Sequence, residues 1–329
     1  ELSERWLSRQ QTSGSRQEPI EALRELSERE RSVAQLMALR KTNREIAETL
    51  FLSEGTVKQY INRIYSKLQL TGTAQEKRRA LTALLQSEGH TVKPGPWAGA
   101  LVIEFAGSPA ASAAFKEGLF HVQGLASQFA ALCVDAKPGQ QVLDLCAAPG
   151  GKSLTLAEAM QDKGQLLSGE FVPTRVPLLQ RSFDRCGVTC AVAVENDATR
   201  HNPGWPKFDR VLCDVPCSGL GVIAKKPDIR YKDLDGIENL LATQQKILQN
   251  GAKYLAPNGR LVYSTCTVNH HENEAQVRQF LQDNQDFSVI APQIILSGMR
   301  VGEYGTLFLP HETSTDGFFA AILERQKNC

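Results

Sequence analysis

Residues 141–153 read QVLDLCAAPGGKS, an apolar run that ends in a glycine turn and leads into a helix-forming stretch. The run QVLDLC predicts a buried strand, and the following helix is expected from Lys152 to Asp162. Further strands are predicted over 165–170, 191–197, 208–216 and 259–266, with helices extending through Arg181 and over 236–255. A last strand pair is expected around 307–310 and 318–324. Alternating strands and helices predict an α/β sheet.

Polar and reactive residues follow the predicted strands at their carboxyl ends, where open α/β sheets bind ligands. The glycine turn spans Cys146–Lys152, the next strand ends in Glu170, and the third ends in Asn196 and Asp197. The fourth ends in Asp214. The glycine spacing is neither G-x-G-x-x-G nor a P-loop, which disfavours a dehydrogenase or an NTPase. Carboxylates on successive strands behind a glycine turn favour a cofactor that contains adenosine.

The composition indicates a globular protein of two domains. The chain has 329 residues, 42 % of them hydrophobic, and a net charge of +1. Its eight cysteines lack the paired spacing of a zinc site, so no metal is expected. A signal peptide is not evident, and no apolar run reaches the ~20 residues of a membrane helix. We therefore expect free thiols and a cytoplasmic location.

The N-terminal part of the sequence is helical in pattern. Residues 1–20 are polar and predict a flexible tail. Two S/T-x-x-E capping boxes follow, Ser27 with Glu30 and Thr42 with Glu45. Ser53 is expected to cap a helix whose apolar residues recur with helical spacing. They are Val57, Ile61, Ile64 and Leu68.

The segment 26–70 resembles the LuxR-type helix-turn-helix, and we assign residues 21–88 to such a domain. In that family the helix that starts at Ser53 enters the major groove of DNA. The resemblance implies that the DNA-facing residues are Thr56, Lys58, Gln59, Asn62 and Arg63. The alternative is a small helical bundle used for protein contacts or for docking RNA.

The remainder, residues 89–329, resembles the bacterial RNA (cytosine-5) methyltransferases of the Sun/Fmu ribosomal RNA type. The matching blocks are PGPW, FKEGLFHVQGLASQ, VLDLCAAPGGKS, FDRVLCDVPCSGLGVIAKKPDIR, GRLVYSTCTVNHHENE and LPHETSTDGFF. This resemblance implies a Rossmann-like S-adenosylmethionine-dependent methyltransferase sheet behind a small all-α domain. The implied cofactor residues are Cys146, Ala147, Ala148, Pro149, Gly150, Gly151, Lys152, Glu170, Asp197 and Asp214.

The same resemblance gives the two thiols their roles. Cys266, in YSTCT, would add to carbon 6 of cytosine, so that carbon 5 can attack a methyl group. Cys217, in DVPCSG, would assist release of the methylated base, while Asp214 and Lys152 would contact the cytosine. The implied product is 5-methylcytosine in RNA, most simply in small-subunit ribosomal RNA. Two segments after the thiols would line the RNA groove: residues 269–273, and a basic segment with Lys225, Lys226 and Arg230.

Other functions stay open at this point. A DNA-binding regulator could use the α/β domain to sense S-adenosylmethionine, but a sensor needs no nucleophile. A tRNA cytosine methyltransferase would share every motif, whereas a DNA cytosine methyltransferase would place its nucleophile in the Pro-Cys motif and leave Cys266 unexplained. The ribosomal enzymes carry a NusB-like RNA-binding domain where this chain has its helix-turn-helix. The target RNA, the origin of the two-part chain and its oligomeric state are therefore not defined by the sequence.

Overall fold

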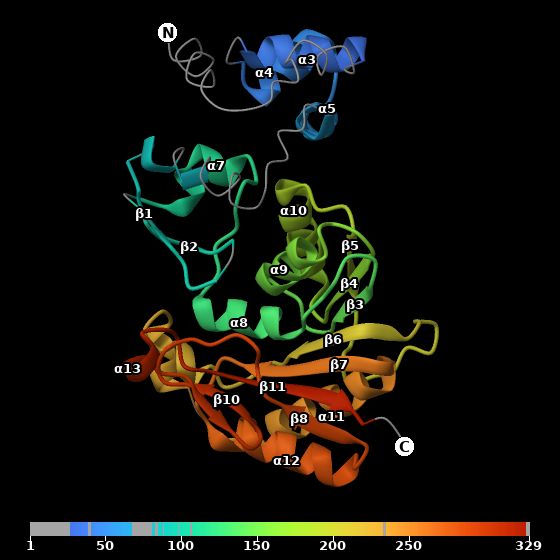
Figure 1. Ribbon diagram of the computed structural model, residues 1–329, viewed down its shortest axis with the longest axis vertical. Helices are drawn as coiled ribbons and strands as arrows, with labels where there is room; N and C mark the ends of the chain where they lie inside the picture. Colours follow the sequence, from blue (N-terminus) through green and yellow to red (C-terminus); the bar gives the residue numbers. More distant parts are fainter. Residues whose placement is uncertain are drawn as a thin grey trace, which may run out of the picture. The chain divides into compact units, whose positions relative to one another are not determined.

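The computed structural model contains two compact units, residues 1–104 and 105–329 (Figure 1). It describes the ranges 27–38, 41–67, 81–82, 85–87, 89–97, 99–105, 107–232 and 235–326. The predicted tail, residues 1–20, lies outside them.

The first unit contains the three helices expected from the capping boxes: α3 (Glu28–Ala38), α4 (Asn43–Leu50) and α5 (Glu54–Lys67). Both boxes form: the Ser27 amide donates to Glu30 at 2.7 Å, and the Thr42 amide donates to Glu45 at 2.7 Å. Ser53 caps α5 by accepting from the Thr56 amide. The helices pack around a small buried cluster of Val33, Ile46, Ala47 and Val57.

A two-stranded hairpin, β1 (Thr91–Pro94) with β2 (Leu101–Glu104), is grouped with the first unit. The two units divide after Glu104. The domain limits taken from the sequence, 21–88 and 89–329, remain predictions.

The second unit is built on a nine-stranded mixed sheet, as the sequence predicts for an α/β fold. Its main order is β5-β4-β3-β6-β7-β11-β10-β9, and β8 pairs with β11. The strands are β3 (Gln141–Asp144), β4 (Gln165–Glu170), β5 (Ala191–Glu195), β6 (Phe208–Asp214), β7 (Leu255–Thr265), β8 (Phe287–Ile290), β9 (Arg300–Gly302), β10 (Gly305–Phe308) and β11 (Phe318–Arg325). The first five in this order are parallel, and β11 lies antiparallel to β7. The sequence did not predict β8 or β9.

Helices cover both faces of this sheet. The α-helices of this unit are α7 (Ala113–Lys116), α8 (Leu125–Cys133), α9 (Gly151–Ala159), α10 (Val176–Cys186), α11 (Ile237–Tyr254), α12 (Glu274–Asp283) and α13 (Pro310–Thr313). Alternate residues of the central strands, such as Leu143, Val211 and Leu261, share one core with α11 and α12. On the other side α8 contacts β7 and β11, and Phe129 of α8 packs edge-on against Phe308. In Figure 1, α8 and α9 accordingly lie across the sheet from α11 and α12.

Short 3-10 helices fill the connections: η1 (Pro109–Ala111), η2 (Pro173–Arg175), η3 (Leu220–Val222), η4 (Pro227–Tyr231) and η5 (His270–Glu272). The strand predicted around 307–310 runs over 305–308 instead, because Pro310 begins α13. Of the helices in the described ranges, none has both the length and the apolarity needed to span a bilayer.

Candidate active site

The carboxyl ends of the five parallel strands meet at one edge of the sheet and carry most of the predicted site residues. Asp144, Glu170 and Asp214 are the last residues of β3, β4 and β6. Cys266 directly follows β7, and Cys217 lies in the loop after β6. The structure therefore brings the predicted residues Glu170, Asp214, Cys217 and Cys266 to one edge of the sheet.

The glycine turn after β3 forms one wall of a cavity of about 210 Å³. Gly150 has φ +107° and precedes α9, and a Cβ atom there would lie 2.8 Å from Leu179. Glycine suits this position because it adopts a positive φ without strain and has no Cβ atom to press against Leu179. Predicted cofactor residues that line the cavity are Cys146, Ala147, Ala148, Pro149, Gly151, Lys152 and Asp214. Gly150, Glu170 and Asp197 do not line it.

Asp144 also lines this cavity and was not among the predicted residues. It is fully buried, and its Oδ2 accepts a hydrogen bond from Ser153 at 2.7 Å. Its other oxygen, Oδ1, has no hydrogen-bond partner. Burial raises the pKa of Asp144 to about 7, and the nearby Asp214 carboxylate acts in the same direction. A positively charged group in the cavity would satisfy this carboxylate.

Glu170 ends β4, Asp197 lies two residues after the end of β5, and local hydrogen bonds already satisfy part of both carboxylates. Glu170 is buried, and its Oε1 accepts from the Val172 amide at 2.8 Å. Asp197 accepts from the amide and the hydroxyl of Thr199 at 3.0 and 2.6 Å, and these bonds lower its pKa. The buried Asn196 beside it has an amide nitrogen without a partner. The sheet edge beyond the cavity thus offers both hydrogen-bond acceptors and a hydrogen-bond donor.

The two thiols predicted to react with a base are direct neighbours. The Sγ atoms of Cys217 and Cys266 lie 3.3 Å apart, within hydrogen-bond distance for sulfur. This bond lowers the pKa of Cys266 and raises that of Cys217, which burial raises further. Lys152 also lowers the pKa of Cys266, against an opposing effect of Asp214. Cys266 is therefore the stronger candidate for the thiolate, and Cys217 for the protonated thiol.

Lys152 and Asp214 form an ion pair beside the thiols. Lys152 Nζ lies 2.7 Å from Asp214 Oδ2, and Ser264 donates to the other oxygen, Oδ1, at 2.7 Å. The ammonium lies 5.3 Å from the centre of the Phe318 ring on β11. Both side chains are largely buried, so neighbouring atoms restrict how they can move. Both residues also line the cavity, and the ion pair therefore lies at its wall.

Buried polar residues after β7 hold the loop that carries Cys266. Asn273, which is fully buried, accepts from Thr265 Oγ1 at 2.6 Å and donates to the Thr267 carbonyl at 3.0 Å. It therefore holds the residues on both sides of Cys266. Ser264 and Asn273 were not predicted from the sequence as individual site residues. Their only sequence signal was nearness to the STC motif.

A backbone contact connects three segments around the thiols. The Gly317 amide donates to the Gly221 carbonyl at 2.8 Å, and the Gly221 amide donates to the Cys266 carbonyl at 3.0 Å. A Cβ atom on Gly221 would lie 1.9 Å from the Gly317 carbonyl oxygen. The segment before β11 is thus packed directly against the thiol loops.

The residues predicted to bind nucleic acid are on the surface where the structure describes them. Lys225, Lys226 and Arg230 are exposed, and Lys225 forms an ion pair with Asp316 at 2.5 Å. In the first unit, Gln59 is exposed on α5. The side chains of Lys58, Asn62 and Arg63 lie outside the described residues, although their backbones belong to α5.

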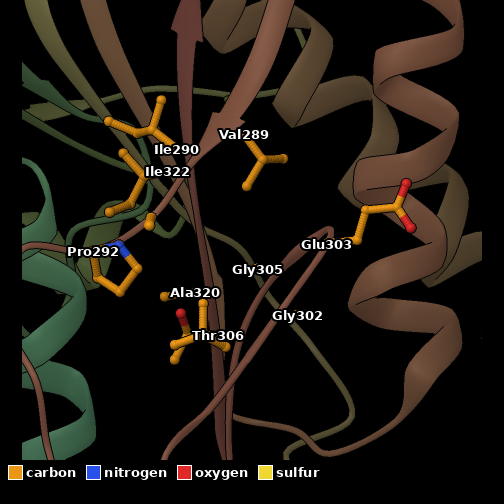
Figure 2. A pocket seen from close by; sticks show the side chains of 11 residues that line it. Val289, Ile290, Pro292, Gly302, Glu303, Gly305, Thr306, Ala320 and Ile322 are labelled. Carbon is orange, nitrogen blue, oxygen red and sulfur yellow. The ribbon is translucent and has the colours of Figure 1, made fainter.

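A second cavity, of about 100 Å³, lies between β8, β11 and the β9–β10 hairpin (Figure 2). Aliphatic side chains such as Val289, Ile290 and Ile322 line it, together with the polar residues Glu303 and Thr306. It contains no strand-end residue of the parallel sheet and no thiol, so it is separate from the candidate active site.

The fold is that of S-adenosylmethionine-dependent methyltransferases. NSun6 from Pyrococcus horikoshii, solved with SFG, an analogue of S-adenosylmethionine, has 30% sequence identity and a TM-score of 0.62. That match covers 68% of this chain and 57% of the other.

Residues 131–324 match the model of the 16S rRNA methyltransferase RsmB/F family, and the chain belongs to this family. It is similar to the "Probable ribosomal RNA small subunit methyltransferase B" of Synechocystis, with 39% identity over 64% of this chain and 49% of that protein. The Bacillus subtilis protein of the same name is 35% identical over 76% of this chain and 57% of its own length. The chain thus spans about half the length of these curated relatives. Residues 24–80 match the model of the bacterial regulatory proteins of the luxR family.

Membership of this family confirms the resemblance seen in the sequence, and it does not favour a regulator that merely senses the cofactor.

The thiol geometry predicts how the protein reacts with iodoacetamide. Because Cys217 stabilises the Cys266 thiolate, Cys266 should be alkylated with a midpoint pH below that of an ordinary cysteine. In a Cys217→Ala variant the midpoint should rise and the rate at pH 7 should fall. Mass spectrometry of the Cys266 peptide across pH measures both. An unchanged midpoint in the variant would contradict the assignment of Cys217 as donor.

Proposed function

We propose that the protein transfers a methyl group to carbon 5 of a cytosine in RNA, with small-subunit ribosomal RNA as the substrate. The observation that supports this most directly is the hydrogen-bonded pair Cys217 and Cys266, in which one thiol favours the thiolate and the other stays protonated. A transfer that needs no covalent intermediate would not need this pair. The names of the relatives support ribosomal RNA as the substrate.

The cavity beside the glycine turn is suited to S-adenosylmethionine, which supplies the methyl group as a sulfonium. The ligand carries positive charge, and Asp144 Oδ1 is a buried acceptor without a partner in that cavity. The turn from Cys146 to Lys152 allows close approach of a ligand to its backbone. Glu170 and Asp197 are placed at the next strand ends to contact the ribose and the adenine, as the family resemblance implies.

The chain's own residues account for activation of the base. Cys266 adds through its sulfur to carbon 6 of cytosine, which turns carbon 5 into a nucleophile for the methyl group. Once its sulfur is bonded to the base, Cys266 no longer holds the Cys217 proton, so Cys217 can lose that proton to solvent and accept the proton of carbon 5. The double bond between carbons 5 and 6 then forms again, and the Cys266 sulfur leaves as a thiolate. Cys217 assists this release from 3.3 Å away.

Lys152 and Asp214 are placed to orient the base. Their ion pair lies at the cavity and close to Cys266, so an incoming cytosine edge can exchange hydrogen bonds with both side chains. A base inside a duplex cannot reach this depth, so the target nucleotide must be unpaired or flipped out. The exposed Lys225, Lys226 and Arg230 would then contact RNA phosphates, although Lys225 must exchange its partner Asp316 to do so.

Replacement of the nucleophile tests the proposal. Cys266→Ala should abolish methyl transfer, because carbon 6 is no longer attacked, while cofactor affinity stays within a few-fold of wild type. Tritiated methyl incorporation into a 16S ribosomal RNA transcript measures the first property, and calorimetry measures the second. Activity that persists within a few-fold of wild type would disprove the covalent mechanism.

Replacement of the second thiol should separate attack from release. Cys217→Ala should accumulate a covalent complex with RNA, because Cys266 still attacks but release fails. The complex is a slow band on a denaturing gel that disappears with RNase, and it should require an intact Cys266. If the band forms instead in Cys266→Ala, the two roles are reversed.

We further propose that the helical unit, by its match to the luxR family model, binds duplex DNA through α5. Lys58 and Arg63 would contact phosphates, and Gln59 and Asn62 would contact bases. Affinity for duplex DNA should fall steeply with salt. Fluorescent duplex DNA displaced by unlabelled DNA or by ribosomal RNA fragments tests this. Better competition by RNA at every salt concentration would assign the unit to RNA delivery instead.

A further inference from the structure

Glu272 is a fully buried carboxylate between the two thiol loops, and the mechanism above does not use it. It lies in η5, after the loop that carries Cys266, and its side chain has no exposed surface. From the sequence, residues 269–273 were expected to line the RNA groove. For Glu272 and Asn273 this expectation is wrong, because both are buried.

Four neutral donors converge on this carboxylate. The amide of Ser218 donates to Oε2 at 2.7 Å, and the Ser218 hydroxyl donates to Oε1 at 2.5 Å. Gln244 of α11 donates to Oε2 at 3.0 Å, and Asn269 donates to Oε1 at 3.1 Å. In the described part of the chain, no ion pair joins Glu272 to a cation. A buried carboxylate without a cation is retained only if its oxygens are well satisfied.

Three of the four donors come from the loops that carry the thiols, and the fourth, Gln244, comes from α11. Ser218 follows Cys217 directly, and the same Gln244 amide also donates to the carbonyl of Pro216, the residue before Cys217, at 3.0 Å. On the other loop, Asn269 lies shortly after Cys266 and donates its own amide to Thr267. The hydroxyls of Ser218 and Thr267 are 2.9 Å apart. Since Ser218 donates to Glu272, its oxygen accepts from Thr267.

We propose that Glu272 is a positioning residue that fixes Cys217 against Cys266 by holding both thiol loops through one carboxylate. The significance of this role for methyl transfer rests on the function proposed above. The contact itself belongs to the chain and can be measured without RNA. An amide at this position has one acceptor oxygen, so its NH₂ group would face donors and loosen one loop.

The first test is the alkylation profile of Cys266 in Glu272→Gln, which keeps the side-chain shape. If Cys217 is no longer aligned with Cys266, the midpoint pH for alkylation of Cys266 should rise. It should approach the midpoint pH measured for Cys266 in the Cys217→Ala variant. Lys152 and Asp214 also affect the pKa of Cys266, but the Glu272→Gln substitution leaves both residues in place. The matched control is Glu324→Gln, an isosteric change at a carboxylate of β11 that pairs with Arg260, and it should leave the midpoint unchanged.

Ser218→Ala provides a second, milder variant, because it removes one hydroxyl from the same network and keeps the backbone amide. It should shift the midpoint in the same direction as Glu272→Gln. Wild-type midpoints in both variants would overturn the proposal. A lower melting temperature without a shifted midpoint would also overturn it, since that result describes a purely structural residue.

The second test uses a 16S ribosomal RNA transcript. Glu272→Gln should lower turnover by up to about 100-fold through misplacement of the thiols, accumulate the covalent RNA complex, and leave cofactor affinity unchanged. If Cys266→Ala remains active, the proposed function fails whatever Glu272 does. If Cys266→Ala is inactive but Glu272→Gln releases RNA like the wild type, only the positioning role fails.

Discussion

The parallel pairing of β6 with β7 is the constraint on which the site depends. In this ladder Asp214 lies opposite Ser264, and the loops that leave the two strands carry Cys217 and Cys266. A shift of two residues along β7 would displace one loop by about 6.6 Å relative to the other. The 3.3 Å thiol contact and the hydrogen bond from Ser264 to Asp214 would both be lost. The register of one strand pair thus determines the chemistry at the sheet edge.

Burial determines how charge is distributed around this edge. Lys152 and Asp214 are largely removed from water and neutralise each other, while the Cys266 thiolate is favoured by a neutral donor and by the same lysine. The Glu272 carboxyl group has a different environment, in which its hydrogen-bond partners within the described ranges are neutral donors. Removing one partner of a buried polar pair costs more folding free energy than the contact itself contributes. The reason is that the remaining group stays buried without a partner and without water. The polar residues around the thiols therefore act as a connected set.

The sequence predicted the parts of this structure that have a local signature. The strand ends at Glu170 and Asp214, the glycine turn before α9 and the capping boxes of α3 and α4 follow from short-range patterns, and the structure confirms them, whereas the first strand ends at Asp144, two residues before the predicted Cys146. Asp144 and Glu272 were missed as functional residues, because what distinguishes them is an unsatisfied oxygen or several donors from distant segments. The short edge strand β9 has little apolar periodicity and was missed for that reason. The roles of individual site residues remain predictions.

The contact between Gly221 and Gly317 has a consequence for synthesis of the chain. Both thiols are translated before the segment that contains Gly317 and β11. Until that segment docks, β7 has an open edge, the Gly221 carbonyl lacks its partner, and the ring of Phe318 is missing beside Lys152. The arrangement around Cys266 is thus completed by a segment that is translated after both thiols. A nascent chain that already displays both reactive sulfurs does not yet hold them in the geometry of the folded protein.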